Sequence, residues 1–292
     1  MSIIPFLMVL VSAVTHGVWN FLAKQAGDKD VFIGLSKISE AIIFSIPFSV
    51  VLYFSGGYGY AHWFIFILVA ACFVFLNYFF LSRAYERLEL SVAYPISRSS
   101  TLFLPILGFV FIRERIDLIG LIAIVIITMT VFILQLNSFD RNEIKNIFRK
   151  LVRPGVLFAL LAALTVASYT IWDKVAVTHI QPFLYFYSYT FITALFYLLL
   201  FRKKSSKSKI SLEWQQHKVS IIAVGVLNTF TYLLVLAALG LSKASYVGAL
   251  RQVSLAVGVV LGWRFLDEAL PFPKIMSVIL LIVGSILIIF AK

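Results

Sequence analysis

The chain has 292 residues, of which 61% are hydrophobic and only 13% are charged. The charged share is about half that of an ordinary globular domain, and a soluble protein of this size could not hide so much apolar surface. Lipid is therefore the expected solvent. The single cysteine, Cys72, excludes an intrachain disulfide and a thiolate metal cluster. The net charge of +12 would suggest nucleic acid for a soluble protein, but these basic residues lie mostly between apolar runs.

Apolar runs of about 20 residues predict ten transmembrane helices. They cover residues 3–23, 32–54, 63–85, 91–112, 117–136, 154–173, 182–201, 219–240, 244–264 and 272–290. The first run has neither a basic n-region nor a small-residue cleavage site, so it is predicted as a span and not as a removed signal peptide. No segment between the spans is long enough for a soluble domain.

Basic residues are distributed unequally between the two sides of the predicted membrane. The loops after the odd-numbered spans carry 17 Lys and Arg when Arg83, Arg264 and Lys274 at the adjoining span ends are included, whereas the termini and the other loops carry 5. The positive-inside rule predicts that the two longest loops, 137–153 and 202–218, are cytoplasmic and that both termini lie outside. We therefore expect a multi-pass protein of the cytoplasmic membrane, with the lipid bilayer as a partner and no nucleic acid.

The two halves of the sequence share marked positions at an offset of 153 residues, or 154 for the last pair. The matches are Val18–Asn20 with Ile171–Asp173, Arg98 with Arg251, and Glu114 with Glu268. Because each half holds five spans, an odd number, the second half would enter the membrane upside down. The predicted fold is an all-α polytopic membrane protein whose ten transmembrane helices form two inverted five-helix repeats, 1–136 and 154–292, joined by the basic loop 137–153. Such repeats are typical of secondary transporters, whose substrate site lies near the midplane.

Arg98 and Arg251 each lie about seven residues into a span, roughly 10 Å deep at ~1.5 Å per residue. Arginine at that depth costs at least ~2.5–3.5 kcal/mol unless it faces protein or water. Snorkelling and a structural ion pair are two interpretations. The favoured hypothesis is that both line a central aqueous cavity, where a guanidinium binds carboxylate, phosphate or phosphonate through a bidentate fork.

Other polar and aromatic residues within the spans could line the same cavity. They are His16, Trp19, Asn20, Tyr94, Tyr169, Trp172 and Asp173, together with Asn77, Asn228, Tyr232 and Gln252. For any single tyrosine or tryptophan, packing or interface anchoring is the simpler interpretation, and for His16 an interhelical hydrogen bond is simpler than a proton relay. The i, i+3 spacing of Lys37 and Glu40 predicts an ion pair in which the two charges neutralise each other. The alternative is that Glu40 or His16 couples transport to an ion.

Several motifs are absent from the sequence. There is no G-x-x-x-x-G-K-[ST] loop for ATP, no H-E-x-x-H, and no metal-ligand spacing of His and carboxylates. We therefore expect no enzyme, no cofactor and no metal. Gly258 and Gly262 form a G-x-x-x-G, which more often reflects close packing within a chain than a dimer face. Because the two halves already supply an intramolecular pseudo-dimer, a monomer is expected and a dimer is the alternative.

Ten spans in two halves, with an acid after spans 4 and 9, resemble the EamA type of the drug/metabolite transporter superfamily. "HGVWNFLAK" at His16–Lys24, "YPISR" at Tyr94–Arg98 and "SYTIWDK" at Ser168–Lys174 look like the branch associated with phosphonate-utilisation genes. The resemblance implies a central substrate cavity between the repeats, with the site residues named above in or near it and spans 5 and 10 at the periphery. The chain departs from the family where glycine often precedes the acid, since Arg113 and Asp267 stand there. Members usually keep both termini in the cytoplasm, in contrast to the charge distribution here.

The leading hypothesis is a secondary transporter that moves a small polar metabolite with an anionic group by alternating access. An amino acid, an organic acid or a phospho/phosphonate compound would fit, and Asp173 or Glu40 could hold an amine of a zwitterion. Efflux of hydrophobic cations or drugs is one alternative, which the two arginines disfavour. A non-transporting scaffold or an accessory protein of lipid modification is another. The exact solute, the direction and the coupling ion stay open.

Overall fold

The computed structural model describes residues 1–55, 60–88, 93, 96–141, 145, 155–204 and 207–291. All regular secondary structure in these ranges is helical, as predicted. The helices are α1 (Ile3–Lys24), α2 (Lys29–Ile43), α3 (Ser45–Phe54), α4 (Tyr60–Tyr85), α6 (Ser100–Ile112), α7 (Leu118–Ile133), α9 (Gly155–Ala176), α10 (Pro182–Lys204), α11 (Lys207–Leu241), α12 (Ala244–Leu250), α13 (Val253–Phe265) and α14 (Phe272–Phe290).

Seven apolar stretches of the described helices are long enough to cross a membrane, with α12 and α13 together forming one of them. An eighth is added if α2 and α3, which meet at a bend of 42°, form one broken span. The segments Ile96–Ile112 and Leu118–Ile133 are apolar but shorter. Large apolar side chains face outward, for example Phe109, which is 62% exposed, and Ile279, which is 55% exposed. The chain is therefore a multi-pass membrane protein, and ten crossings remain a prediction.

The segment 202–218, predicted as a long loop, is mostly helical. α10 continues to Lys204, and α11 begins at Lys207, well before the apolar part of that helix. The carboxylate of Glu213 accepts the backbone N–H groups of Gly27 and Asp28 at 3.2 and 2.9 Å, and so holds the turn before α2, which Asp28 itself caps through the Val31 N–H. Polar composition suggested a loop, but outside lipid a polar helix is stable when a tertiary contact of this kind holds it.

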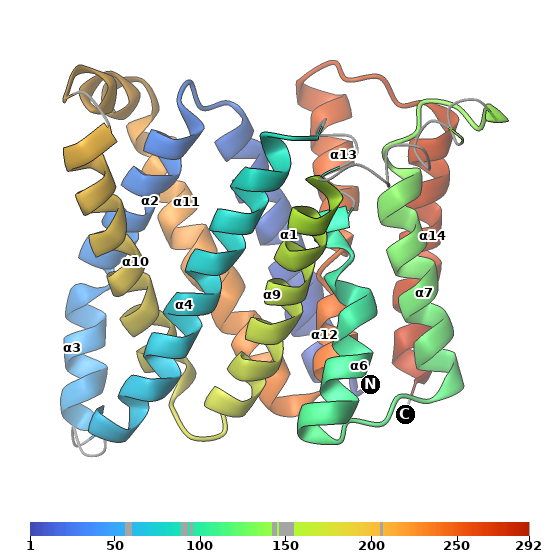
Figure 1. Cartoon of the computed structure of the whole chain (residues 1–292), viewed down its shortest axis with the longest axis horizontal. Coiled ribbons are helices and arrows are strands. Elements are labelled where there is room, and N and C mark those ends of the chain that lie inside the picture. Colours follow the sequence, from blue (N-terminus) through green and yellow to red (C-terminus); the bar gives the residue numbers. More distant parts are fainter. Residues whose placement is uncertain are drawn as a thin grey trace.

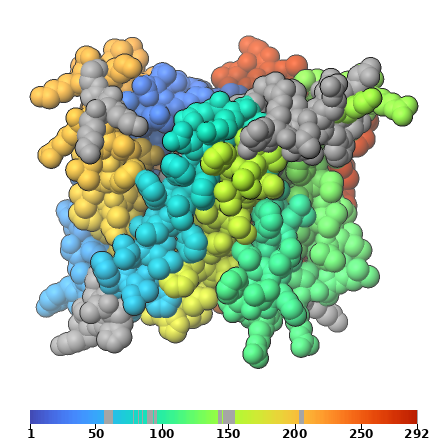
Figure 2. All heavy atoms as spheres, in the orientation of Figure 1, coloured from blue at the N-terminus to red at the C-terminus, as the bar shows by residue number. Residues whose placement is uncertain are grey.

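Helices of the two halves pack mainly against each other. α1 packs on α11 and α13, and α9 packs in the matching way on α4 and α6. α2 contacts α10, and α7 contacts α14 at one end of the molecule (Figure 1). Figure 2 shows α4 and α9 side by side across the visible face. Exchanging the halves converts the pairings of α1 into those of α9 and maps the α2–α10 and α7–α14 pairs onto themselves. Both termini lie at one edge (Figure 1).

The ends of α6 and α13 have the same geometry. Arg113 and Asp267 follow them in the left-handed region, with φ of 53° and 52°. This conformation favours glycine, which agrees with the glycine before the acid that the family resemblance implies. The next residue then turns back on its helix: the N–H of Glu114 donates to the Gly108 carbonyl at 2.9 Å, and that of Glu268 donates to the Gly262 carbonyl at 3.2 Å.

The two glutamates nevertheless make different contacts. Glu114 is 8% exposed, and its carboxylate accepts the N–H groups of Ala244 and Ser245 at 2.8 and 3.1 Å and the Ser245 hydroxyl at 2.7 Å. It thereby caps α12, where a negative charge also interacts favourably with the helix dipole. Glu268 instead pairs with Lys24, and both side chains are partly exposed.

Glu114→Gln removes this charge and one acceptor from a buried cap, so we expect the free energy of unfolding to fall by about 1–2 kcal/mol. Glu268→Gln is the matched control at the repeat-related position. It should cost less than about 1 kcal/mol because an exposed pair is screened by solvent. Thermal unfolding of both purified variants in detergent measures the difference, and equal shifts would contradict the assignment of Glu114 as the stronger cap.

Candidate substrate site at two broken helices

Arg98 and Arg251 both lie where a helix is interrupted. A short helical turn, Ile96–Arg98, ends at Ser99 before α6 begins. α12 ends at Leu250, and α13 begins only after Arg251 and Gln252. The two interruptions are in contact, since Gln252 Nε2 donates to the Arg98 carbonyl at 3.3 Å. The structure therefore brings the backbones that carry both arginines together, one from each half.

α1 contributes His16 to the same region. The His16 side chain lies within electrostatic range of both Arg98 and Arg251. Its ring meets that of Trp19 edge-on, with centroids 4.8 Å apart. α1 also packs directly on α13 through Gly17, where an added Cβ would lie 2.6 Å from Val257. This close approach places α1 beside the broken helix.

Arg251 lies against aromatic rings. Its guanidinium carbon is 5.4 Å from the centroid of the Tyr232 ring, a cation–π distance. Tyr169, Tyr189 and Asp173 are also within electrostatic range. Within the described ranges, no carboxylate lies at ion-pair distance from Arg251.

The carboxylate of Asp173, which lies near Arg251, already accepts hydrogen bonds from two tyrosines. It is 2% exposed. Tyr185 donates its hydroxyl to Oδ1 at 2.6 Å, and Tyr232 donates to Oδ2 at 2.6 Å. Tyr185 and Tyr189 of α10 were missed from the sequence, although their i, i+4 spacing within an apolar span was a signal that they share one face.

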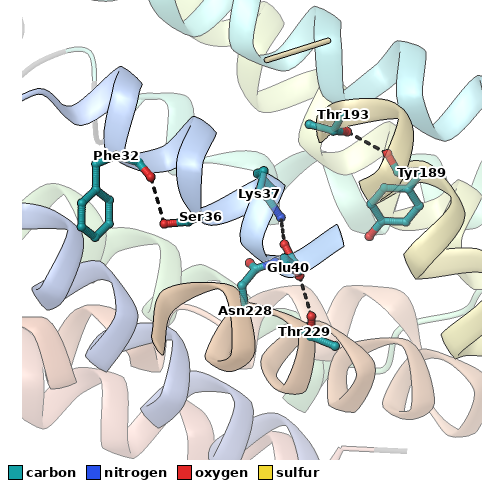
Figure 3. A network of polar contacts seen from close by, with 8 residues as sticks. All are labelled: Phe32, Ser36, Lys37, Glu40, Tyr189, Thr193, Asn228 and Thr229. Atoms are coloured by element: carbon teal, nitrogen blue, oxygen red, sulfur yellow. Dashed lines mark hydrogen bonds and ion pairs between the residues drawn. The ribbon is translucent and has the colours of Figure 1, made fainter. Parts of the chain in front are cut away.

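A second buried carboxylate lies between α2 and α11. Glu40 is 1% exposed and accepts from Lys37 at 2.8 Å, Asn228 at 2.9 Å and the Thr229 hydroxyl at 2.6 Å (Figure 3). The predicted Lys37–Glu40 pair therefore forms. Gly225 permits it, because a Cβ there would lie 3.0 Å from the Ser36 carbonyl.

Two stacked rings connect this network with the arginine. Lys37 Nζ lies 5.9 Å from the centroid of Phe186, and Phe186 stacks on Tyr232 at 5.4 Å. Tyr232 in turn carries Arg251 on its face. The faces of this aromatic pair are thus next to cations of the protein itself.

Some predicted site residues point elsewhere. Trp172 donates its Nε1–H to the Phe66 carbonyl at 3.0 Å and packs on that ring, toward α4. Asn20 donates to the His16 carbonyl of its own helix at 2.7 Å. Asn77 joins α4 to α9 through the Ala162 carbonyl at 3.1 Å. Tyr94 lies outside the described residues.

Comparison with known protein families identifies one family whose model matches this sequence. The model of the EamA-like transporter family matches residues 3–136 and 153–290. The chain belongs to the EamA-like transporter family. EamA-like proteins are membrane transporters of small molecules and not enzymes, and the two arginine-bearing breaks described above fall one in each matched segment.

A solved structure titled "Crystal structure of protein" has the same fold. Its TM-score is 0.71 at 13% sequence identity, over 98% of this chain and 97% of that chain. No curated protein matches the sequence. The resemblance to the phosphonate-associated branch of EamA-like permeases stays a prediction.

Tyr185→Phe removes a hydrogen bond to a buried carboxylate, and we expect it to lower the free energy of unfolding by about 1.5–3 kcal/mol. Tyr187→Phe is a matched control on the same helix, since its hydroxyl donates to the neutral Ala41 carbonyl at 2.8 Å. It should cost about 1 kcal/mol. Thermal or denaturant unfolding of both variants tests this order, and a larger loss for Tyr187→Phe would contradict it.

Proposed function

We propose that this protein is a secondary transporter that moves a small polar metabolite with an anionic group across the cytoplasmic membrane by alternating access. Amino acids, organic acids and phospho or phosphonate compounds are the substrate classes. Arg98 and Arg251 bind the anionic group. Family membership supports transport of a small molecule, and the substrate class rests on the arginines.

The observation that carries this proposal is the meeting of the two arginine-bearing breaks through Gln252 and the Arg98 carbonyl. A guanidinium within a span is costly unless a partner or water solvates it. Arg251 has an aromatic face but no carboxylate at ion-pair distance among the described residues. The guanidinium N–H groups of Arg251 are therefore suited to reversible binding of an anionic substrate, because a permanent ion pair would compete with that substrate.

The alternative of cation efflux has less support. A cationic ligand would need a carboxylate or an aromatic face. Asp173 is taken by two tyrosine hydroxyls, and Glu40 by Lys37, Asn228 and Thr229. The ring of Tyr232 is taken by Arg251. The same contacts disfavour either acid as the holder of a substrate amine.

The architecture we propose is ten crossings in two inverted five-helix repeats, 1–136 and 154–292. The matched packing of α1 and α9, the equivalent ends of α6 and α13, and the paired helix breaks support it. Interrupted helices at the repeat interface are the usual place of substrate sites in such transporters. The basic segments 137–153 and 202–218 would lie in the cytoplasm, and the monomer would be the working unit.

Ion coupling through His16 or Glu40 stays a prediction. His16 is better placed for it, because it lies within electrostatic range of both arginines and would respond to the charge of a bound anion. Glu40, with all its contacts made inside the protein, is better placed to fasten α2 to α11.

Replacement of Arg251 by Gln should weaken anion binding while the protein stays folded. Purified protein in detergent would be screened by thermal shift against amino acids, organic acids, phosphonates and quaternary amines, because a ligand that binds only the native state raises the melting temperature. We expect one anionic class to raise the melting temperature. The Arg251→Gln variant should need at least about ten times more of that ligand for the same shift. Uptake of that anion into proteoliposomes should fall in parallel.

Arg264→Gln serves as the control, since Arg264 is an exposed arginine at the end of the same broken helix. It should bind as the unchanged protein does. Shifts with quaternary amines alone, equal in both variants, would overturn anion transport and favour cation efflux. Binding of no solute class, with intact folding, would favour a scaffold role.

A further inference from the structure

Gln252 has a buried acceptor without a partner. The residue is 5% exposed, and among the described residues nothing donates a hydrogen bond to its Oε1. Its Nε2 donates to the Arg98 carbonyl, which fixes the orientation of the amide, because a flipped amide would place two oxygens against each other. The unpaired atom is therefore a carbonyl oxygen, an acceptor.

The position of this oxygen links it to the proposed substrate site. Gln252 directly follows Arg251 at the break between α12 and α13, and its amide touches the backbone of the opposite break. The acceptor thus lies at the junction of the two segments that carry the arginines. Native proteins pair nearly all buried polar atoms, so an unpaired one at such a junction calls for a donor from elsewhere.

We infer that Gln252 Oε1 accepts a hydrogen bond from a hydroxyl group of the anionic substrate. This inference rests on the proposed function and narrows its substrate to hydroxylated anions, such as hydroxy acids or hydroxyalkyl phosphonates. The arginines bind the charged end, and Gln252 is the specificity-determining residue that recognises the hydroxyl.

The charges around Gln252 favour a hydroxyl over an ammonium group. A second cation beside Arg98 and Arg251 would be repelled. The carboxylate that could offset it, Asp173, already accepts from Tyr185 and Tyr232. A neutral hydroxyl needs only an acceptor, which Gln252 offers.

Trp19 offers a complementary group. Its Nε1 is also buried and without a hydrogen-bond partner among the described residues. The ring contacts His16, which lies within range of both arginines. The Trp19 N–H would donate to the anionic group of the substrate, and Gln252 Oε1 would accept from its hydroxyl. The two unpaired atoms therefore suit the two ends of a hydroxylated anion.

The test is binding of matched ligand pairs to the full-length protein in detergent. The probes are L-lactate and propionate, L-malate and succinate, and 2-hydroxyethylphosphonate and ethylphosphonate, with L-alanine as the ammonium counterpart of L-lactate. In at least one pair we expect the hydroxylated ligand to bind at least about tenfold more tightly than its parent, because the parent leaves the acceptor unpaired. L-alanine should bind more weakly than L-lactate.

Gln252→Met should remove this preference, because Met offers no acceptor for the hydroxyl. The readout is the ratio of affinities within each pair, since loss of the contact to the Arg98 carbonyl affects both ligands of a pair. Gln215→Met, at an exposed glutamine, should keep the preference. Should Gln252→Met fail to fold, the comparison of ligands on the unchanged protein still decides. Equal binding within every pair, tighter binding of L-alanine, or a preference that survives in Gln252→Met would overturn the inference and leave anion transport intact. Binding of no anion at all would overturn both.

Discussion

The cost of holding a guanidinium in a low-dielectric span governs the centre of this protein. An arginine there requires polar groups around it, and an unbroken helix offers few because its backbone is internally bonded. At Ser99 and at Gln252 the helix tightens into i→i+3 backbone hydrogen bonds beside each arginine. The contact from Gln252 to the Arg98 carbonyl then joins the two interruptions. The breaks, the arginines and the junction of the halves are thus one feature.

Among the described residues, no buried acid lies at ion-pair distance from Arg251. Asp173 is satisfied by two hydroxyls, and Glu40 is neutralised by Lys37 on its own helix. Arg251 instead uses the face of Tyr232, which stacks on Phe186 beside Lys37. The positive charge of Arg251 is thus next to acids that already have partners. A site of this kind attracts an anion and discriminates by the few polar atoms that remain unpaired.

The sequence predicted what depends on composition and missed what depends on tertiary contacts. The bounds of α1, α10 and α14 follow from apolar runs, and the arginines stood out because charge is rare in spans. The break after Arg251 has neither glycine nor proline, so no local signal marked it. Likewise Trp172 donates to a carbonyl of α4, and Glu213 in the polar start of α11 holds the turn before α2. Those outcomes depend on neighbours that the sequence does not identify.

The repeat is symmetric in backbone and asymmetric in charge at its two related glutamates. At the edge that carries the termini, Glu114 is buried and holds three donors at the start of α12. At the opposite edge its counterpart, Glu268, makes only a partly exposed pair with Lys24. Exposed pairs contribute little, whereas a buried carboxylate that loses its donors is costly. Near Lys24 that buried role falls to Glu213, which accepts from Gly27 and Asp28 across the halves. The two edges are therefore both held by a buried carboxylate, but only at the edge with the termini is it the repeat's own glutamate.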